Sequence, residues 1–284
     1  MATQPCRAVT LSDGRQLAYA EHGDLNAPAV IYFHSLPGSR LERPDILSPI
    51  KNIRLICVDR PGYGESSLQE NRTLLNWADD IVELADALAL ETFSIIGFSG
   101  GGPHALACAY KIPQRLKNVV VCNSSVSLNA DVPGKALPAQ LKSLYELSCG
   151  DIQNAINQLK PFASSMLAIM SVEETPLPEV DKKIFRQPTL ITQYKASLAE
   201  SFKQGTAALA WDLRATGSDW GFDIRDISCT INLWGGGKDQ NTPPEITEYL
   251  SHTLAHCQTH IIDEWGHYFL YEHFEKVVGT MDFR

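Results

Sequence analysis

The chain has 284 residues, of which 44% are hydrophobic and 20% are charged. This composition is typical of a soluble globular protein with a sizeable core, and it excludes disordered, collagen-like and coiled-coil chains. The net charge of −9 offers no positive surface to a phosphate backbone, so nucleic acid is not an expected partner. The length fits one large α/β domain, or a core with an insertion.

Targeting and membrane segments are absent from the sequence pattern. The first residues form no apolar stretch, and no run approaches ~18 consecutive apolar residues, so we expect a cytoplasmic protein that does not enter a membrane. The seven cysteines are scattered without a CxxC pair, so we predict no structural zinc site.

The first half of the chain reads as strands alternating with helices. Two short strands are predicted at residues 8–11 and 16–20, joined by an Asp-Gly turn. The next apolar runs alternate with helical segments, which is typical of a parallel sheet covered on both faces. These runs lie at residues 30–33, 53–58, 93–96 and 116–122. Thr73 is a candidate cap for a helix with an apolar stripe between the second and third of these runs.

The second half begins with a different pattern of predicted elements. Residues 126–208 contain no apolar strand but several helix-like stretches interrupted by prolines such as Pro161. We predict an inserted helical cap there, with the core formed by residues 1–125 and 209–284. Strands are predicted again at 230–234 and 259–262, with helices at about 244–255 and about 268–278. The expected fold class is therefore α/β.

The segment Gly97-Phe98-Ser99-Gly100-Gly101 carries the clearest chemical motif. It follows a predicted strand and opens a predicted helix, which is the setting that a nucleophile elbow requires. A serine on such a turn takes a strained backbone conformation, and the flanking glycines keep the helix and strand apart. A surface turn also explains a bare GxSxG, but the strand-turn-helix setting favours a nucleophile.

A serine nucleophile needs a base and an orienting carboxylate, which follow it in the order acid, then histidine, on the fold of this motif. Asp239 lies in the loop after the strand at 230–234, and His267 comes just after the last strand. Gly266 allows a tight turn before the histidine. These three side chains are the candidate triad: Ser99, Asp239 and His267.

Other histidines are given structural interpretations. His34 is expected to be a hydrogen-bonded support, and His104 points ~140° away from Ser99 on its helix, as expected for helix surface or packing. Three histidines are spaced like metal ligands, but no carboxylate converges on them, so a surface face is favoured over zinc. They are His252, His256 and His260.

The motifs taken in order resemble the α/β-hydrolase superfamily over essentially the whole chain. Residues 34–40, His-Ser-Leu-Pro-Gly-Ser-Arg, resemble the HGxPG oxyanion loop of that family, and residues 59–66 resemble its DxxGxGxS turn. Ser35 stands where the family usually has glycine, which changes the oxyanion loop and adds a hydroxyl that can donate to a substrate. The resemblance implies a mostly parallel eight-stranded sheet flanked by helices, with the cap covering the serine.

The same resemblance implies the site. Ser99 attacks a carbonyl, His267 takes its proton, and Asp239 holds the imidazole, while the backbone N–H groups of Leu36 and Gly100 form the oxyanion hole. No cofactor or metal is required. The residues expected to contact the substrate are Ser35, Phe98, Phe162, Met166 and Met170.

The apolar cap favours a small to medium, largely apolar ester, lactone, thioester or amide as the small-molecule substrate. Proline-iminopeptidase-like and C–C bond hydrolysis remain alternatives, the former because Glu173 and Glu174 can hold a substrate amine. A non-hydrolytic relative, such as a receptor, lyase or biosynthetic catalyst, is the alternative from another class. A homodimer is left open.

Overall fold

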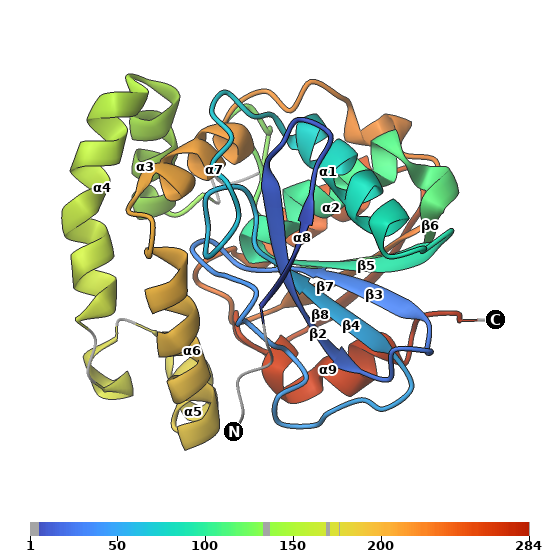
Figure 1. Ribbon diagram of the computed structural model, residues 1–284. Coiled ribbons are helices and arrows are strands. Elements are labelled where there is room, and N and C mark those ends of the chain that lie inside the picture. The colour runs from blue at the N-terminus through green and yellow to red at the C-terminus, as the bar shows by residue number, and fades with distance from the viewer. Residues whose placement is uncertain (1–5, 133–136, 169–170, 176, 284) are drawn as a thin grey trace.

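A computed structural model describes residues 6–132, 137–168, 171–175 and 177–283 (Figure 1). Its centre is an eight-stranded sheet with the strand order β1-β2-β4-β3-β5-β6-β7-β8. The first two strands run antiparallel to their neighbours, and all the other pairs are parallel. The predicted mostly parallel sheet is therefore confirmed. The strands are β1 (Arg7–Thr10), β2 (Gln16–Gly23), β3 (Ala29–Phe33), β4 (Arg54–Val58), β5 (Phe93–Phe98), β6 (Leu116–Cys122), β7 (Ile231–Gly236) and β8 (Cys257–Ile262).

Helices cover both faces of this sheet and stand beside it. They are α1 (Leu74–Ala87), α2 (Gly102–Lys111), α3 (Ala139–Cys149), α4 (Ile152–Leu167), α5 (Glu179–Phe185), α6 (Pro188–Ser201), α7 (Ala207–Gly217), α8 (Pro244–Thr253) and α9 (Leu270–Val278). None of the helices in the described part of the chain is long and apolar enough to cross a membrane.

The two faces of the sheet carry separate apolar cores, because side chains alternate along each strand. Ile31 and Phe33 of β3 pack in one cluster with residues of α1, α2 and α8, whereas Val30 and Tyr32 pack in another with residues of α5, α6 and α9. Figure 1 shows α1 and α2 on one side of the sheet and α9 on the other. Parallel strands buried on both faces explain the continuous apolar runs in the sequence.

A local signal in the sequence fixes the start of α1, and strand pairing fixes the ends of β2 and β8. Thr73 Oγ1 accepts a hydrogen bond from the Asn76 N–H at 3.2 Å, and the Asn76 side chain accepts from the Thr73 N–H at 2.9 Å, so the predicted cap of α1 is present as a capping box. Several strands are longer than predicted, among them β2, β5 and β8. Pairing extends β2 to Gly23, opposite Arg54, and starts β8 at Cys257.

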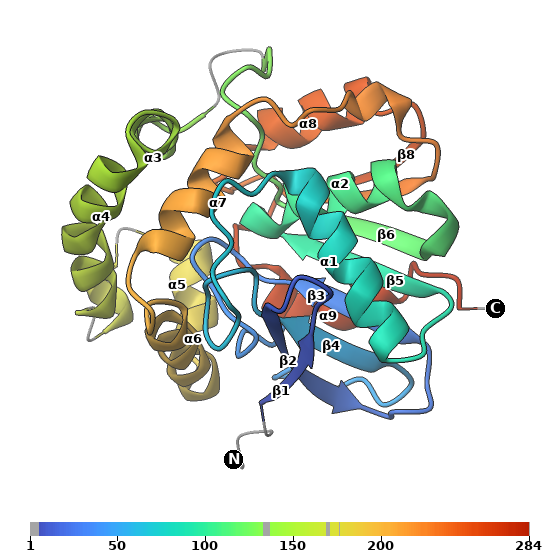
Figure 2. The same cartoon turned by 45° about the horizontal axis from the view of Figure 1, so that its top comes forward.

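The segment predicted as a cap folds into α3, α4, α5 and α6, which stand to one side of the sheet (Figures 1 and 2). α7 packs with them through Leu209 and Leu213. The proline interpretation was wrong at Pro161, which lies inside α4 rather than at a break. Pro161 and Asn157 are exposed, so water can solvate the carbonyl that loses its helical partner. The boundaries of the cap stay a prediction.

Candidate active site

Ser99 lies on a sharp turn between β5 and α2. Its φ of 54° is in the left-handed region, which costs free energy for a residue with a side chain. A Cβ at Gly97 would overlap the Gly101 carbonyl, and a Cβ at Gly101 would overlap the Phe33 carbonyl. The two glycines therefore allow strand and helix to approach closely, as the motif requires, and the turn presents the serine to the pocket.

The structure brings the three predicted triad residues together. His267 Nε2 lies 3.1 Å from Ser99 Oγ, and His267 Nδ1 lies 2.7 Å from Asp239 Oδ2. With the proton on Nδ1, the imidazole donates to the carboxylate and accepts from the serine hydroxyl. Asp239 also accepts from the N–H groups of Asn241 and Thr242 at 2.7 and 2.9 Å, which fixes the orientation of its carboxylate.

Opposing influences set the proton affinity of His267. Its burial disfavours the imidazolium, but the negative charge and hydrogen bond of Asp239 favour it, with a smaller contribution from Asp181. The balance raises the pKa of His267 above its ordinary value. The site therefore stabilises the protonated imidazole that forms when a serine hydroxyl attacks.

The residues predicted to form the oxyanion hole lie against each other beside the serine. Both Leu36 and Gly100 line the pocket that contains Ser99, and a Cβ at Gly100 would overlap the Leu36 side chain. Close packing of this kind holds two loops from different parts of the chain together. Assignment of their N–H groups to an oxyanion stays a prediction.

The Ser35 side chain is engaged within the protein. Its Oγ donates to Glu42 Oε2 at 2.5 Å, and its N–H donates to Glu42 Oε1 at 3.0 Å. Tyr32 donates its hydroxyl to the same carboxylate at 2.6 Å. Burial raises the pKa of Glu42, opposed by these hydrogen bonds. Ser35 lines the pocket, yet its hydroxyl has acceptors within the protein in Glu42 and in the Pro37 carbonyl at 3.1 Å, and these contacts stabilise the loop.

Arg60 supports the oxyanion loop from below. Its fully buried guanidinium donates to the carbonyls of His34 and Ser35 and to Asp212 on α7. His34 accepts the Arg60 N–H at 3.2 Å, so the expected structural role of this histidine agrees with its contacts. His104 is 2% exposed and lies 3.4 Å from Asp212, which corrects the surface alternative and favours packing. These contacts cross-link the loop with α2 and α7.

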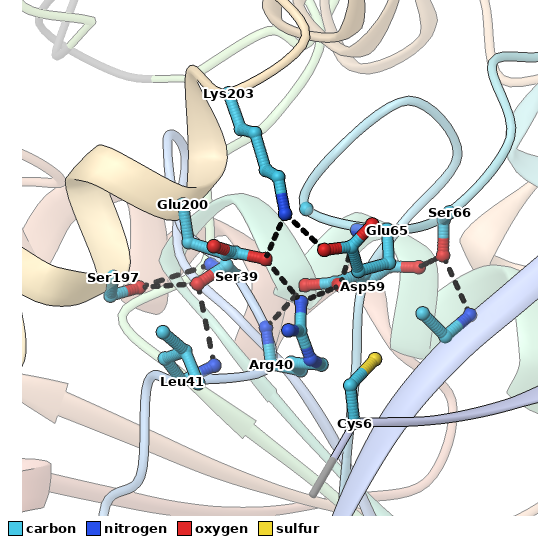
Figure 3. A network of polar contacts seen from close by, with 12 residues as sticks. Cys6, Ser39, Arg40, Leu41, Asp59, Glu65, Ser66, Ser197, Glu200 and Lys203 are labelled. Atoms are coloured by element: carbon cyan, nitrogen blue, oxygen red, sulfur yellow. Dashed lines mark hydrogen bonds and ion pairs between the residues drawn. The ribbon is translucent and has the colours of Figure 1, made fainter. Parts of the chain in front are cut away.

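A second polar network joins the oxyanion loop to the cap helix α6 (Figure 3). Ser197 Oγ lies 3.1 Å from the Ser39 N–H, and Arg40 lies 2.7 Å from Glu200 and 2.6 Å from Asp59. Burial raises the pKa of Asp59 to about 6, although Arg40 opposes that change. Asp59 opens the predicted DxxGxGxS turn, so this motif acts here as a structural anchor.

A cavity of about 370 Å³ opens above Ser99. Apolar side chains of α3, α4 and α6 form part of its wall, including Leu141, Leu144, Phe162, Met166, Ile191, Tyr194 and Leu198. Three residues predicted to contact the substrate line this cavity: Ser35, Phe162 and Met166. Phe98 does not line it, because its ring is fully buried beneath His267 at a centroid distance of 5.2 Å. Met170 lies outside the described residues.

Sequence reasoning missed the contribution of α6 to this cavity. Ile191, Tyr194 and Leu198 recur at helical spacing after Pro188, so the signal was present in the pattern. It also missed Asp181, for which no periodic signal exists. Among the described residues, no group of three or more His, Cys, Asp or Glu could hold a metal ion. Of the three histidines considered for zinc, His260 stacks on Trp234 at 4.1 Å.

Comparison with known proteins identifies the family of this chain. The family model for the alpha/beta hydrolase fold matches residues 28–274. A 3-oxoadipate enol-lactonase from Acinetobacter baylyi is 30% identical over 121 residues, which are 42% of this chain and 46% of that protein. A 2-hydroxymuconate semialdehyde hydrolase from a Pseudomonas strain is 24% identical over 254 residues, or 84% of this chain and 79% of that protein.

Solved structures resemble the whole chain. A hydrolase from Pseudomonas aeruginosa superposes with a TM-score of 0.71 at 22% identity and covers 96% of both chains. An enol-lactonase from Burkholderia xenovorans gives a TM-score of 0.70 at 19% identity, covering 96% of this chain and 97% of that one. These structures share the fold, and the family model over residues 28–274 shows that the chain belongs to the α/β-hydrolase family. The match to the lactonase from Acinetobacter spans less than half of that relative.

Proposed function

We propose that this chain is a serine hydrolase that cleaves a small to medium, largely apolar ester, lactone or thioester through an acyl-enzyme on Ser99. The observation that carries the proposal is the continuous chain of contacts from Ser99 Oγ through His267 to Asp239 at the base of an apolar cavity. The cavity volume of about 370 Å³ falls in the range of small-molecule sites.

The reaction follows from the geometry of these groups. Ser99 Oγ attacks the carbonyl carbon as His267 Nε2 removes its proton, and the N–H groups of Leu36 and Gly100 stabilise the oxyanion. Collapse breaks the bond to the leaving group, which takes the proton from His267. Water then gives a proton to His267 and its oxygen to the acyl carbon, so that the acid leaves and Ser99 regains its proton.

C–C bond hydrolysis is the second candidate. The 2-hydroxymuconate semialdehyde hydrolase that aligns with 84% of this chain supports it. The iminopeptidase alternative has less support from Glu173, which pairs with Arg186 at the surface and does not line the cavity. The side chain of Glu174, the other residue predicted for this role, lies outside the described part of the structure. A direct comparison of p-nitrophenyl butyrate, a medium-chain lactone and a vinylogous 1,5-diketone would rank the reactions.

The decisive experiment is intact mass spectrometry after treatment with a fluorophosphonate. We expect one adduct on the wild-type protein and none on Ser99→Ala, because a fluorophosphonate reacts rapidly only with a serine that a neighbouring base activates. Turnover of the butyrate ester should disappear in the same variant. Labelling of Ser99→Ala at the wild-type rate, or no labelling of the wild type, would overturn the proposal and favour a non-hydrolytic binding protein.

A further inference from the structure

Asp181 is a buried carboxylate in contact with the histidine loop. It belongs to α5, in the segment predicted as the cap, and 86 residues separate it from His267. Its Oδ2 accepts the His267 N–H at 3.1 Å, and its Oδ1 accepts the Tyr268 N–H at 2.9 Å. The side chain is fully buried, so these two main-chain groups are satisfied by a charged acceptor rather than by water.

Two neighbouring features show that the loop is built around this carboxylate. A Cβ at Gly266 would overlap the Asp181 carboxylate, so the glycine provides space for Asp181, a role that the tight-turn interpretation did not foresee. From the opposite side, Asn123 Nδ2 donates to the His267 carbonyl at 2.7 Å. The backbone of His267 is thus held at its N–H by Asp181 of α5 and at its carbonyl by Asn123, the residue after β6.

We propose that Asp181 is a positioning residue for the triad: from the cap it fixes the backbone of His267, and its negative charge favours the imidazolium during attack. This inference rests on the proposed function, because it assigns the cap a part in the same reaction. Asp181 contacts the main chain and not the imidazole, so it acts through His267.

The charges around His267 define what the proposal predicts. Three carboxyl groups influence the imidazole, namely Asp239, Asp181 and Glu42. Burial raises the pKa of Asp181 itself, opposed by its two N–H donors and by His267. Removal of its charge should therefore lower the pKa that governs activity, whereas a residue that only docks α5 would leave that pKa unchanged.

The test compares Asp181→Asn and Asp181→Glu by the pH dependence of fluorophosphonate labelling at Ser99 and of kcat/KM for p-nitrophenyl butyrate. Asn keeps the size of the side chain but loses its charge, and its NH2 group cannot accept one of the two main-chain N–H groups. We therefore expect a lower apparent pKa and a plateau rate reduced about tenfold through misplacement of the base. Glu keeps the charge in a displaced position, so the apparent pKa should stay near the wild-type value while the plateau falls. Glu179→Gln, exposed on the same helix, is the matched control and should change neither quantity.

The outcomes separate this inference from the proposed function. Wild-type labelling combined with an unchanged pKa and plateau in Asp181→Asn would overturn the role of Asp181 and leave the serine hydrolase proposal intact. Failure of the wild type to label would overturn the proposed function instead. If Asp181→Asn does not fold, Asp181→Glu decides: a wild-type plateau, or a reduced plateau accompanied by a lower unfolding midpoint, contradicts the proposal, and a reduced plateau at the wild-type unfolding midpoint supports it.

Discussion

His267 lies between Ser99 and Asp239 in the proposed site, and its surroundings favour the charged imidazole. Burial opposes that charge, and the neighbouring Asp239 carboxylate outweighs burial, so the pKa of the ring is raised. A base of this kind is inactive while it holds its proton. The protonation of this one residue therefore determines how activity responds to pH.

We expect kcat/KM for p-nitrophenyl butyrate to rise with pH and to level off above a pKa higher than the ordinary value of histidine. The reason is that only neutral His267 can accept the proton of Ser99.

Asp239→Asn should reduce the plateau of this pH profile by about 10⁴-fold, because the imidazole loses its orienting acceptor. Stopped-assay rates between pH 5 and 9 would check both predictions, and a pH-independent rate in the wild type would contradict the first.

A second residue-scale prediction concerns Gly101. Alanine at this position would overlap the Phe33 carbonyl, so Gly101→Ala should destabilise the fold by ~1–3 kcal/mol. Gly279→Ala is the control, because that glycine already has a helical φ of −61° and ψ of −13°. Urea unfolding of both variants measures the difference. Equal midpoints would show that the elbow tolerates a side chain.

At the scale of the elements, the cap helices supply most of the apolar wall of the cavity. α3, α4 and α6 each place side chains over Ser99, and α5 and α6 also contact the catalytic loops through Asp181 and Ser197. One set of helices thus lines the cavity and also contacts the loops that carry the candidate catalytic and oxyanion-hole residues. Substitutions in the cap can therefore affect either specificity or rate, depending on which surface they touch.

Met166→Ala tests the specificity surface. Met166 lines the cavity from α4, so its truncation should lower kcat/KM for p-nitrophenyl hexanoate by about tenfold and leave the acetate ester nearly unchanged. The adjacent Leu167 is 47% exposed and does not line the cavity, so Leu167→Ala is a matched control. Equal responses of the two variants across the ester series would place the acyl chain elsewhere.

For the whole molecule, a buried charge cluster joins α7 to the segment between β4 and α1. Asp212 of α7 lies 2.8 Å from Arg60 and 2.6 Å from Arg72, and the three side chains are almost fully buried. Burial alone would raise the pKa of Asp212, but the two guanidinium groups outweigh it and hold that pKa well below its usual range. This cluster lies under the oxyanion loop, which Arg60 also contacts.

Asp212→Asn should therefore destabilise the protein by ~3–5 kcal/mol near neutral pH, because two buried arginines lose their counter-charge. A carboxylate with a depressed pKa stabilises the fold above its unfolded-state pKa, so the difference from wild type should shrink as the pH falls below about 4. Denaturant unfolding at pH 7 and pH 3 measures both effects. Asp223→Asn, in an exposed pair with Arg225, should unfold like the wild type.

The sequence by itself determined the sheet and the order of the candidate catalytic residues. Strands buried on both faces require continuous apolar runs, and the elbow around Ser99 is a local feature of five consecutive residues, so both leave a readable pattern. The segment predicted as a cap was recognisable as helical because helical spacing of apolar residues is also a local pattern. Pro161 misled because its tolerance depends on exposure to water, which the pattern of residue types does not show.

The tertiary structure alone decided which distant residues support the site. Asp181 meets His267 across 86 positions and Asp212 meets Arg60 across 152 positions, and such contacts produce no periodicity along the chain. It also placed Phe98 beneath the imidazole rather than in the cavity, because strand twist and packing determine the direction of a side chain at the end of β5. The candidate triad can therefore be recognised from short sequence motifs. The carboxylates and guanidinium groups that hold it in place come together only when the chain folds.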